Sequence, residues 1–188
     1  MSERVTGERP VAPPRTTERP VPLLQVAVIV ATYVVVGLAA GWLWYALWEP
    51  AIGVVVQHQW YPDGAGLRRD FSATALYVII AVVAGAVLGS VAAVLGGRRP
   101  MLTLVAALAG AVLAGWLMLV VGEWLGPADP QTLANDAKDG TTFPGALAVT
   151  GASPLLAFPM GTLAALAFVF TIFTGKSDEP RIPEEPRG

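Results

Sequence analysis

Apolar residues along this chain are concentrated in four long uncharged stretches, which cover residues 20–48, 71–97, 100–122 and 140–175. A helix needs about 20 predominantly apolar residues to cross a bilayer, because each residue rises about 1.5 Å. Each stretch is long enough for one span, and the Thr- and Pro-containing start of the fourth stretch is typical of a loop. We predict transmembrane helices over about 22–48, 72–95, 101–124 and 152–173.

The two ends of the chain are polar and show no apolar periodicity. Residues 1–20 carry charges of both signs and several prolines, and residues 174–188 have a similar composition. Such segments cannot bury enough apolar surface to offset the entropy lost on ordering. The sequence therefore predicts a four-span membrane domain over 21–173 between two disordered tails, 1–20 and 174–188.

The loop between the first two spans contains a strand signal. Residues 54–61 (VVVQHQWY) are β-branched and aromatic, and residues 62–66 (PDGAG) form a turn cluster, so we expect a small β-hairpin. Alternate residues from Val54 to Trp60 share one face of such a strand, and we expect that face to rest on the helix ends. In the loop after the third span, residues 131–138 predict a short helix. The predicted fold is an all-α membrane protein of four transmembrane helices, with a small outer β-hairpin between helices 1 and 2.

The short connection between spans two and three orients the chain. Residues 96–100 (GGRRP) leave room only for a tight turn, so these spans are predicted to form an antiparallel helical hairpin with Arg98 and Arg99 at its tip. Nine of the twelve Lys and Arg residues lie in this turn and the two tails, against three in the opposite loops. The positive-inside rule then places both termini in the cytoplasm and the chain in the cell membrane as a multi-pass protein.

Composition supports the membrane assignment and excludes several chemistries. Hydrophobic residues make up 54% of the chain and charged residues 14%, whereas soluble domains average about 25% charged. The first partner is therefore the lipid bilayer. The absence of cysteine excludes disulfides, thiolate nucleophiles and Cys-ligated metal centres, and a single histidine excludes bis-His haem. A net charge of −2 gives no electrostatic footprint for nucleic acid.

No motif indicates catalysis, a cofactor or a metal. The sequence contains no nucleophile triad, nucleotide-binding loop, HExxH or paired-carboxylate motif. His58 has no companion ligand nearby, so we interpret it as a surface residue of the hairpin. Residues 135–140 resemble a calcium loop but lack the acid that such a loop needs near Ala146. Pro154 and Pro159 predict a kink at the start of the fourth span.

Small residues recur at four-residue spacing within the spans. Lipid provides no hydrophobic drive between helices, so close backbone approach through such grooves supplies the packing energy. The grooves can serve either packing within one chain or a dimerisation face, and we favour packing within one chain because every span has one. The candidate helix-packing residues are Gly37, Gly41, Gly85, Gly89 and Gly110.

The outer ends of the spans carry aromatic and charged residues. The aromatic cluster that ends the first span is typical of headgroup depth. Glu123 follows the uncharged stretch 100–122 and precedes Trp124, which places its carboxylate at the interface rather than in a proton or cation relay. The aromatic residues are Trp42, Trp44, Tyr45 and Trp48, and the candidate outer charge cluster is Glu49, Arg68, Arg69 and Glu123.

Several short segments together carry a family resemblance. They are the Arg/Pro-rich tail, GWLWYALWEP at the end of the first span, LRRDF, the GGRRP turn, GEWLG at the end of the third span and the proline-bearing last span. With these features the chain resembles, over nearly its full length, a group of small uncharacterised four-span membrane proteins of high-GC Gram-positive bacteria. The resemblance implies a topology and transfers no activity and no site residues.

Two functional interpretations remain. The first is a non-catalytic accessory or interaction component of the cell envelope, whose partner is another membrane protein or a second copy. The alternative is a small oligomeric transporter or channel, which requires aligned polar residues within the membrane. We favour the first, because the residues available for such a path are few: Thr32, Ser90, Thr103 and Thr162.

Overall fold

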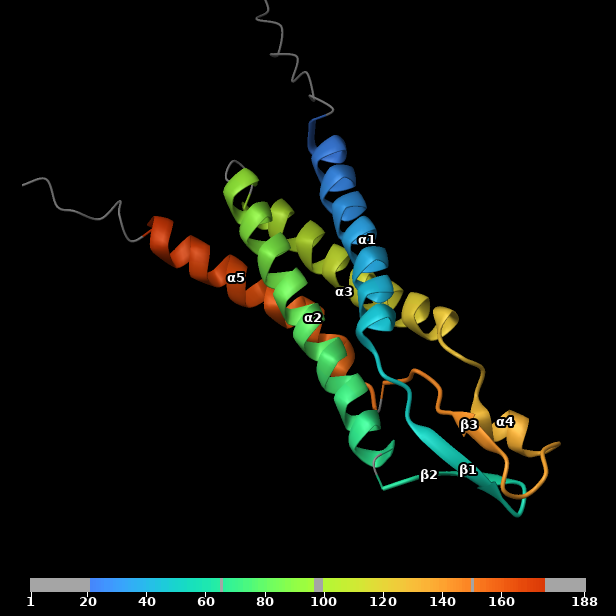
Figure 1. Ribbon diagram of the computed structural model, residues 1–188. Coiled ribbons are helices and arrows are strands. Elements are labelled where there is room, and N and C mark those ends of the chain that lie inside the picture. The colour runs from blue at the N-terminus through green and yellow to red at the C-terminus, as the bar shows by residue number, and fades with distance from the viewer. Residues whose placement is uncertain (1–20, 65, 97–99, 150, 175–188) are drawn as a thin grey trace, which may run out of the picture.

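Four long helices form the body of the molecule (Figure 1). The computed structural model describes residues 21–64, 66–96, 100–149 and 151–174. The long helices are α1 (Val21–Leu47), α2 (Gly66–Leu95), α3 (Pro100–Leu125) and α5 (Ala157–Thr174), the last preceded by the 3-10 turn η1 (Ser153–Leu156). Their lengths and apolar composition are sufficient for four membrane crossings. The predicted four-span fold is confirmed.

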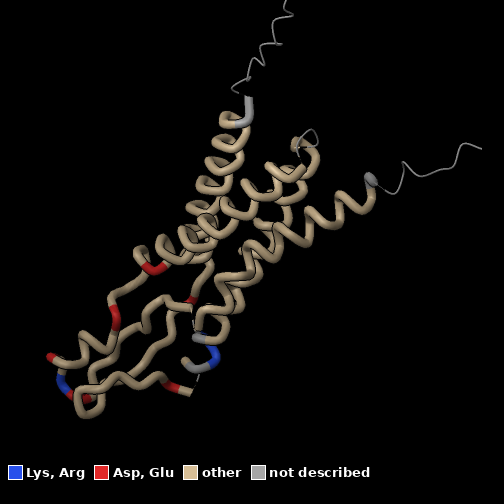
Figure 2. The backbone as a smooth tube through the Cα atoms, turned by 180° about the vertical axis from the view of Figure 1, so that it is seen from behind, with Lys and Arg blue, Asp and Glu red and all other residues tan. Residues whose placement is uncertain are grey.

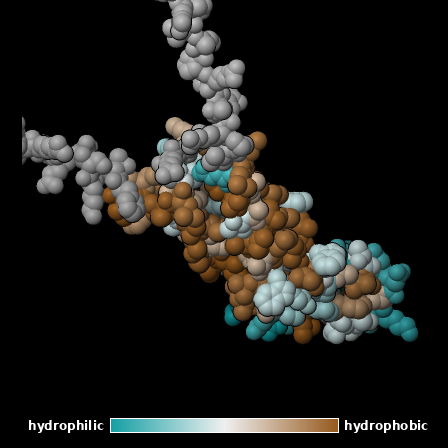
Figure 3. Space-filling model, turned by 90° about the horizontal axis from the view of Figure 1, so that it is seen from above, coloured by the Kyte–Doolittle hydropathy of each residue, from teal (hydrophilic) through white to brown (hydrophobic). Residues whose placement is uncertain are grey.

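Charge and hydropathy divide the molecule into two zones. Among the described residues, Lys, Arg, Asp and Glu lie around the sheet and at the adjoining helix ends, while the remaining length of each long helix is free of them (Figure 2). The surface over the helices is mainly hydrophobic, and hydrophilic residues gather at the sheet end (Figure 3). Large apolar side chains such as Leu24, Val35, Val87 and Phe168 project outward from the helices. A surface of this kind faces lipid, and the chain is a multi-pass membrane protein.

The helices associate as two close pairs. The most extensive contacts are those of α1 with α3 and of α2 with α5, whereas α2 and α3 touch over only a short part of their lengths. As expected, only a short connection separates spans two and three, because α2 ends at Leu95 and α3 begins at Pro100. The structure differs in that each of these helices finds its main packing partner elsewhere in the chain.

Two prolines mark the entrance to the last helix. Pro154 lies in η1, and Pro159 is the third residue of α5. In the first turn of a helix a backbone N–H has no partner within the helix, so proline costs little there. The two prolines therefore lie at the start of the last span, and α5 itself is continuous.

A small sheet and a short helix form the second zone. The strands β1 (Ile52–Val56), β2 (Gln59–Pro62) and β3 (Thr142–Pro144) make an antiparallel sheet in the order β2-β1-β3, and α4 (Pro130–Ala134) lies next to it. The predicted hairpin between α1 and α2 is confirmed, and α4 is shorter than the helix predicted over 131–138. The third strand was not predicted. It pairs Ile52 with Pro144 and Val54 with Thr142.

The buried face of β1 is the opposite of the expected one, whereas Trp60 pairs with Val55 and lies on the buried side as expected. Gly53 and Val55 are the buried residues of β1, while Ile52 and Val56 are exposed. The turn places Gln57 at φ 51° and His58 at φ 61°, the left-handed geometry of a two-residue hairpin turn that Asn-Gly usually provides. The predicted tails, apart from Thr174, and the tip residues Arg98 and Arg99 lie outside the described residues.

Candidate functional site

The glycines of α1 face α3 across a backbone contact. A Cβ added at Gly37 would lie 2.7 Å from the Ala114 Cα, and one at Gly41 would lie 2.7 Å from the Met118 carbonyl oxygen. Such distances leave room for hydrogen only, so the two helices approach at a spacing that any side chain would prevent. On the facing helix, Gly110 lies under the ring of Tyr33.

The glycines of α2 have the same relation to α5. A Cβ at Gly85 would collide with the Phe158 carbonyl oxygen, and one at Gly89 would lie 2.5 Å from the Thr162 carbonyl oxygen. Gly161 of α5 faces the backbone of Val82 in return and was not singled out from the sequence. All five candidate glycines thus lie against helices of the same chain.

Buried aromatic side chains link the two helix pairs. The Trp44 Nε1–H of α1 donates to the Ala73 carbonyl of α2 at 2.9 Å, and the Tyr77 hydroxyl of α2 donates to the Gly115 carbonyl of α3 at 2.8 Å. The Trp44 and Tyr77 rings meet edge to face with centroids 5.2 Å apart. Of the aromatic residues that end the first span, Trp44 is fully buried against the other helices, whereas Trp42 is 60% exposed. The headgroup depth expected for the cluster stays a prediction.

The hydroxyl of Thr162 joins three helices. It accepts a hydrogen bond from the Tyr33 hydroxyl of α1 at 3.4 Å and donates to the Gly85 carbonyl of α2 at 3.1 Å. Thr162 itself belongs to α5 and is fully buried. In a bilayer no water can replace these partners, so the two bonds hold the helix pairs in register.

The other three hydroxyls that were candidates for a transport path, Thr32, Ser90 and Thr103, also bond backbone carbonyls. Thr103 donates to the Gly96 carbonyl and accepts from the Gln25 amide, both at 3.2 Å. Thr32 and Ser90 each donate to the carbonyl four residues earlier in their own helices. Within the described part of the chain, no buried side-chain nitrogen or oxygen lacks a hydrogen-bond partner.

Replacing Thr162 by valine tests this cross-link. The substitution keeps the shape of the side chain but removes the donor to Gly85 and the acceptor for Tyr33, so we expect the free energy of unfolding to fall by about 1 kcal/mol. Thermal unfolding in a mild detergent measures the loss. Thr171→Val is the matched control, because the exposed Thr171 hydroxyl bonds only its own helix at Ala167. If Thr162→Val and Thr171→Val were equally stable, the Thr162 hydroxyl would not hold the helices together.

The candidate charge cluster is only partly assembled. Glu49 and Arg69 line one depression of about 320 Å³ at the sheet end of α1 and α2, and the Arg69 Nη1 donates to the Pro50 carbonyl at 3.3 Å. Arg68 is exposed and does not line this depression. Glu123 is also exposed and lies at the end of α3 beside Trp124, which is 82% exposed. The structure therefore brings two of the four predicted residues to one site.

The polar residues of the sheet zone bind backbone groups. The Asp139 carboxylate accepts the Gln57 N–H at 2.9 Å, and Asp129 caps α4 by accepting the Gln131 N–H. The His58 Nδ1 lies 3.1 Å from the Asn135 carbonyl oxygen. Among residues 21–64, 66–96, 100–149 and 151–174, no group of His, Asp and Glu has the arrangement of a metal site. These side chains shape the loops of the sheet zone.

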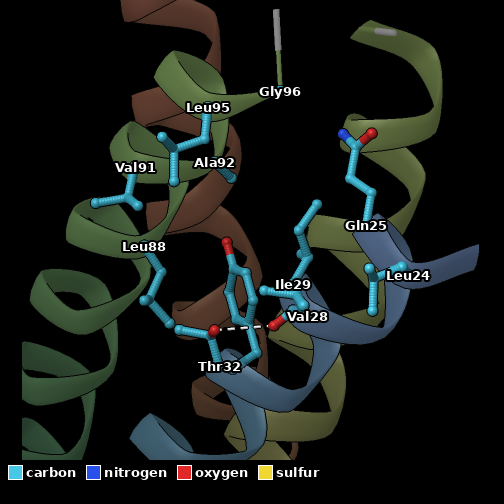
Figure 4. A pocket seen from close by; sticks show the side chains of 11 residues that line it. Leu24, Gln25, Val28, Ile29, Thr32, Leu88, Val91, Ala92, Leu95 and Gly96 are labelled. Atoms are coloured by element: carbon cyan, nitrogen blue, oxygen red, sulfur yellow. Dashed lines mark hydrogen bonds between the residues drawn. The ribbon is translucent and has the colours of Figure 1, made fainter. Parts of the chain in front are cut away.

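A groove runs along the boundary between α1 and α2. These two helices contact one another much less than α1 contacts α3 or α2 contacts α5. The inner part of the groove, of about 320 Å³, is lined mainly by apolar side chains of both helices (Figure 4), and Tyr33 is one of its lining residues. Leu88, Val91 and Leu95 enter it from α2, and Leu24 and Val28 from α1. A second hollow of about 380 Å³ and the depression at Glu49 and Arg69 follow it along the same boundary toward the sheet, and we call these the middle and sheet-end parts of the groove.

Comparison with protein-family models, curated proteins and solved structures finds no match for this chain. The resemblance drawn from its short segments stays a prediction.

Proposed function

We propose that the protein is a non-catalytic accessory or interaction component of the cell envelope. Its helices form a fixed membrane scaffold, its sheet zone lies on the outer side, and both termini lie in the cytoplasm. The partner that we propose is another membrane protein, contacted through the sheet zone and the adjoining helix ends.

The use of the membrane hydroxyls is the observation that carries this proposal. A transport path needs polar groups that are free to exchange partners with a passing solute. Here Thr32, Ser90, Thr103 and Thr162 each donate to a backbone carbonyl. Their hydrogen-bonding capacity is directed to holding helices, and this supports a scaffold role.

The sheet offers a contact surface of suitable chemistry. Ile52 and Val56 project from one face of β1, and Tyr61 lies on the same face because it pairs with Val54. All three are about half exposed. On the opposite face Val55 is fully buried, and the Trp60 Nε1–H of β2 donates to the Phe143 carbonyl of β3, so this face is closed within the sheet. An exposed apolar face on a fixed support is typical of an interaction site.

Co-purification tests the proposed role. The tagged chain, extracted in a mild detergent, is expected to carry a protein partner in constant proportion. Ile52→Ser together with Val56→Ser should release that partner while membrane abundance and thermal stability stay unchanged. Val35→Ser on the exposed side of α1 is the control and should retain it. A partner retained by the double variant, or a chain that always purifies alone, would contradict the proposal.

The proposed orientation predicts the outcome of reporter fusions. Alkaline phosphatase, which is active only outside the cytoplasm, is expected to be active when fused after residue 66 or 138 and inactive after residue 20, 98 or 180. The asymmetry of Lys and Arg is the reason for this expectation. Activity after residue 98 combined with silence after residue 66 would reverse the orientation.

A further inference from the structure

The groove between α1 and α2 changes character at its sheet end. Its middle part is lined only by apolar side chains: Val36, Ala39, Ala40 and Leu43 of α1, and Ile79, Ile80, Val83 and Ala84 of α2. One helical turn further along both helices, the lining becomes Leu47, Leu76 and then Ser72, Glu49 and Arg69. The apolar middle part is thus followed, toward the sheet, by a depression that carries one positive and one negative side chain.

The middle and sheet-end parts of the groove together match one leaflet of a bilayer in length. The rise from Val36 to Leu47 is about 17 Å at about 1.5 Å per residue, and the hydrocarbon of one leaflet is about 15 Å thick. Glu49 and Arg69 follow immediately, at the depth where headgroups begin. The groove is also open on the lipid side, since Ile79 and Val83 are more than half exposed.

The charged end matches one class of headgroup. The Arg69 guanidinium bonds the Pro50 carbonyl through Nη1, and its fork geometry suits a phosphate. Glu49 lines the same depression and is complementary to an ammonium group. The depression thus offers one partner for each of the two opposite charges of a zwitterionic headgroup, a complementarity that an apolar helix face lacks.

We propose that the middle and sheet-end parts of this groove bind a phospholipid of the adjoining leaflet whose zwitterionic headgroup carries a primary ammonium. The acyl chain lies between Ala39 and Ala84, the phosphate contacts Arg69 and the ammonium contacts Glu49. The site is separate from the apolar face of the sheet, so the lipid proposal does not depend on the proposed protein partner.

Native mass spectrometry of the purified protein, titrated with phosphatidylethanolamine and with phosphatidylglycerol, tests the site. The wild type is expected to prefer phosphatidylethanolamine by about fivefold, the size of a partly exposed charge contact. Glu49→Gln should abolish this preference, and Arg69→Gln should weaken binding of both lipids. Ala39→Phe fills the apolar middle part of the groove and should remove the bound lipid.

Val91→Phe is the matched control, because Val91 lines the inner part of the same groove; this variant should bind lipid as the wild type does. Glu49→Gln and Arg69→Gln change side chains at the edge of the fold, so they keep the test decisive even where Ala39→Phe does not fold. Equal affinity of the wild type for the two lipids would overturn the proposal, as would lipid retention by a folded Ala39→Phe variant. Loss of a dimer in Ala39→Phe at unchanged lipid binding would assign the groove to a second copy instead.

Discussion

Replacing Gly89 by leucine is expected to force α2 and α5 apart and to lower the free energy of unfolding by about 3 kcal/mol. A Cβ at this position would lie 2.5 Å from the Thr162 carbonyl oxygen and 3.0 Å from the Thr162 Cα. Both atoms belong to helix backbone, which cannot rotate out of the way as a flexible side chain can. Thermal unfolding followed by circular dichroism in a mild detergent measures the loss.

Gly64→Leu is the matched control, because no heavy atom lies within 4 Å of a Cβ placed at Gly64. We expect this variant to unfold within about 0.5 kcal/mol of the wild type. Packing within one chain would be disproved by a Gly89→Leu variant that keeps its stability while its oligomer becomes smaller.

Replacing Trp44 by alanine is expected to cost about 3 kcal/mol or more, because it leaves a cavity where three helices meet. The indole of α1 packs against the Tyr77 ring of α2 and over Gly122 of α3. It also donates its only N–H to the Ala73 carbonyl. Unfolding in detergent is again the measurement, with Trp44→Phe as an intermediate variant that retains most of the packing and loses the hydrogen bond.

Trp42 provides the comparison on the same helix. It lies two residues earlier and is 60% exposed, so Trp42→Ala should change stability by less than about 1 kcal/mol. If the two tryptophans had equal effects in alanine variants, the assignment of Trp44 to the core would be wrong.

The spans and the hairpin were predictable because their signals are local. Four uncharged stretches each exceed the length of a crossing, and the β-branched residues around Val55 lie beside a turn cluster. The third strand carries no such signal. Thr142–Pro144 is three residues long and contains a proline, and it becomes a strand only because β1, far away in the sequence, offers it a free edge.

The pairing of the helices could not be read from the sequence. Glycines such as Gly41 and Gly85 show that a helix will be approached closely, but they do not say by which neighbour. The same limit applies to Trp44. Aromatic residues at the end of a span usually lie among headgroups, and the rotation of α1 against α3 decides which of them turns inward.

The sequence predicts at which end of the helices the candidate charged residues lie, but not which of them line a common site. Glu49, Arg69 and Glu123 all lie near helix ends at the sheet side, as the length of the spans requires. Only Glu49 and Arg69 line a common depression, because α1 and α2 adjoin there whereas Glu123 is carried by α3.

Ion flux in proteoliposomes that contain the wild type or the Thr162→Val variant tests most directly whether the membrane hydroxyls hold the scaffold together. We expect that neither protein raises flux above that of empty liposomes at pH 5 to 8, and that the variant unfolds at a lower temperature than the wild type. Wild-type flux that disappears in Thr162→Val at an unchanged unfolding temperature would contradict this expectation and would assign this hydroxyl to a transport path.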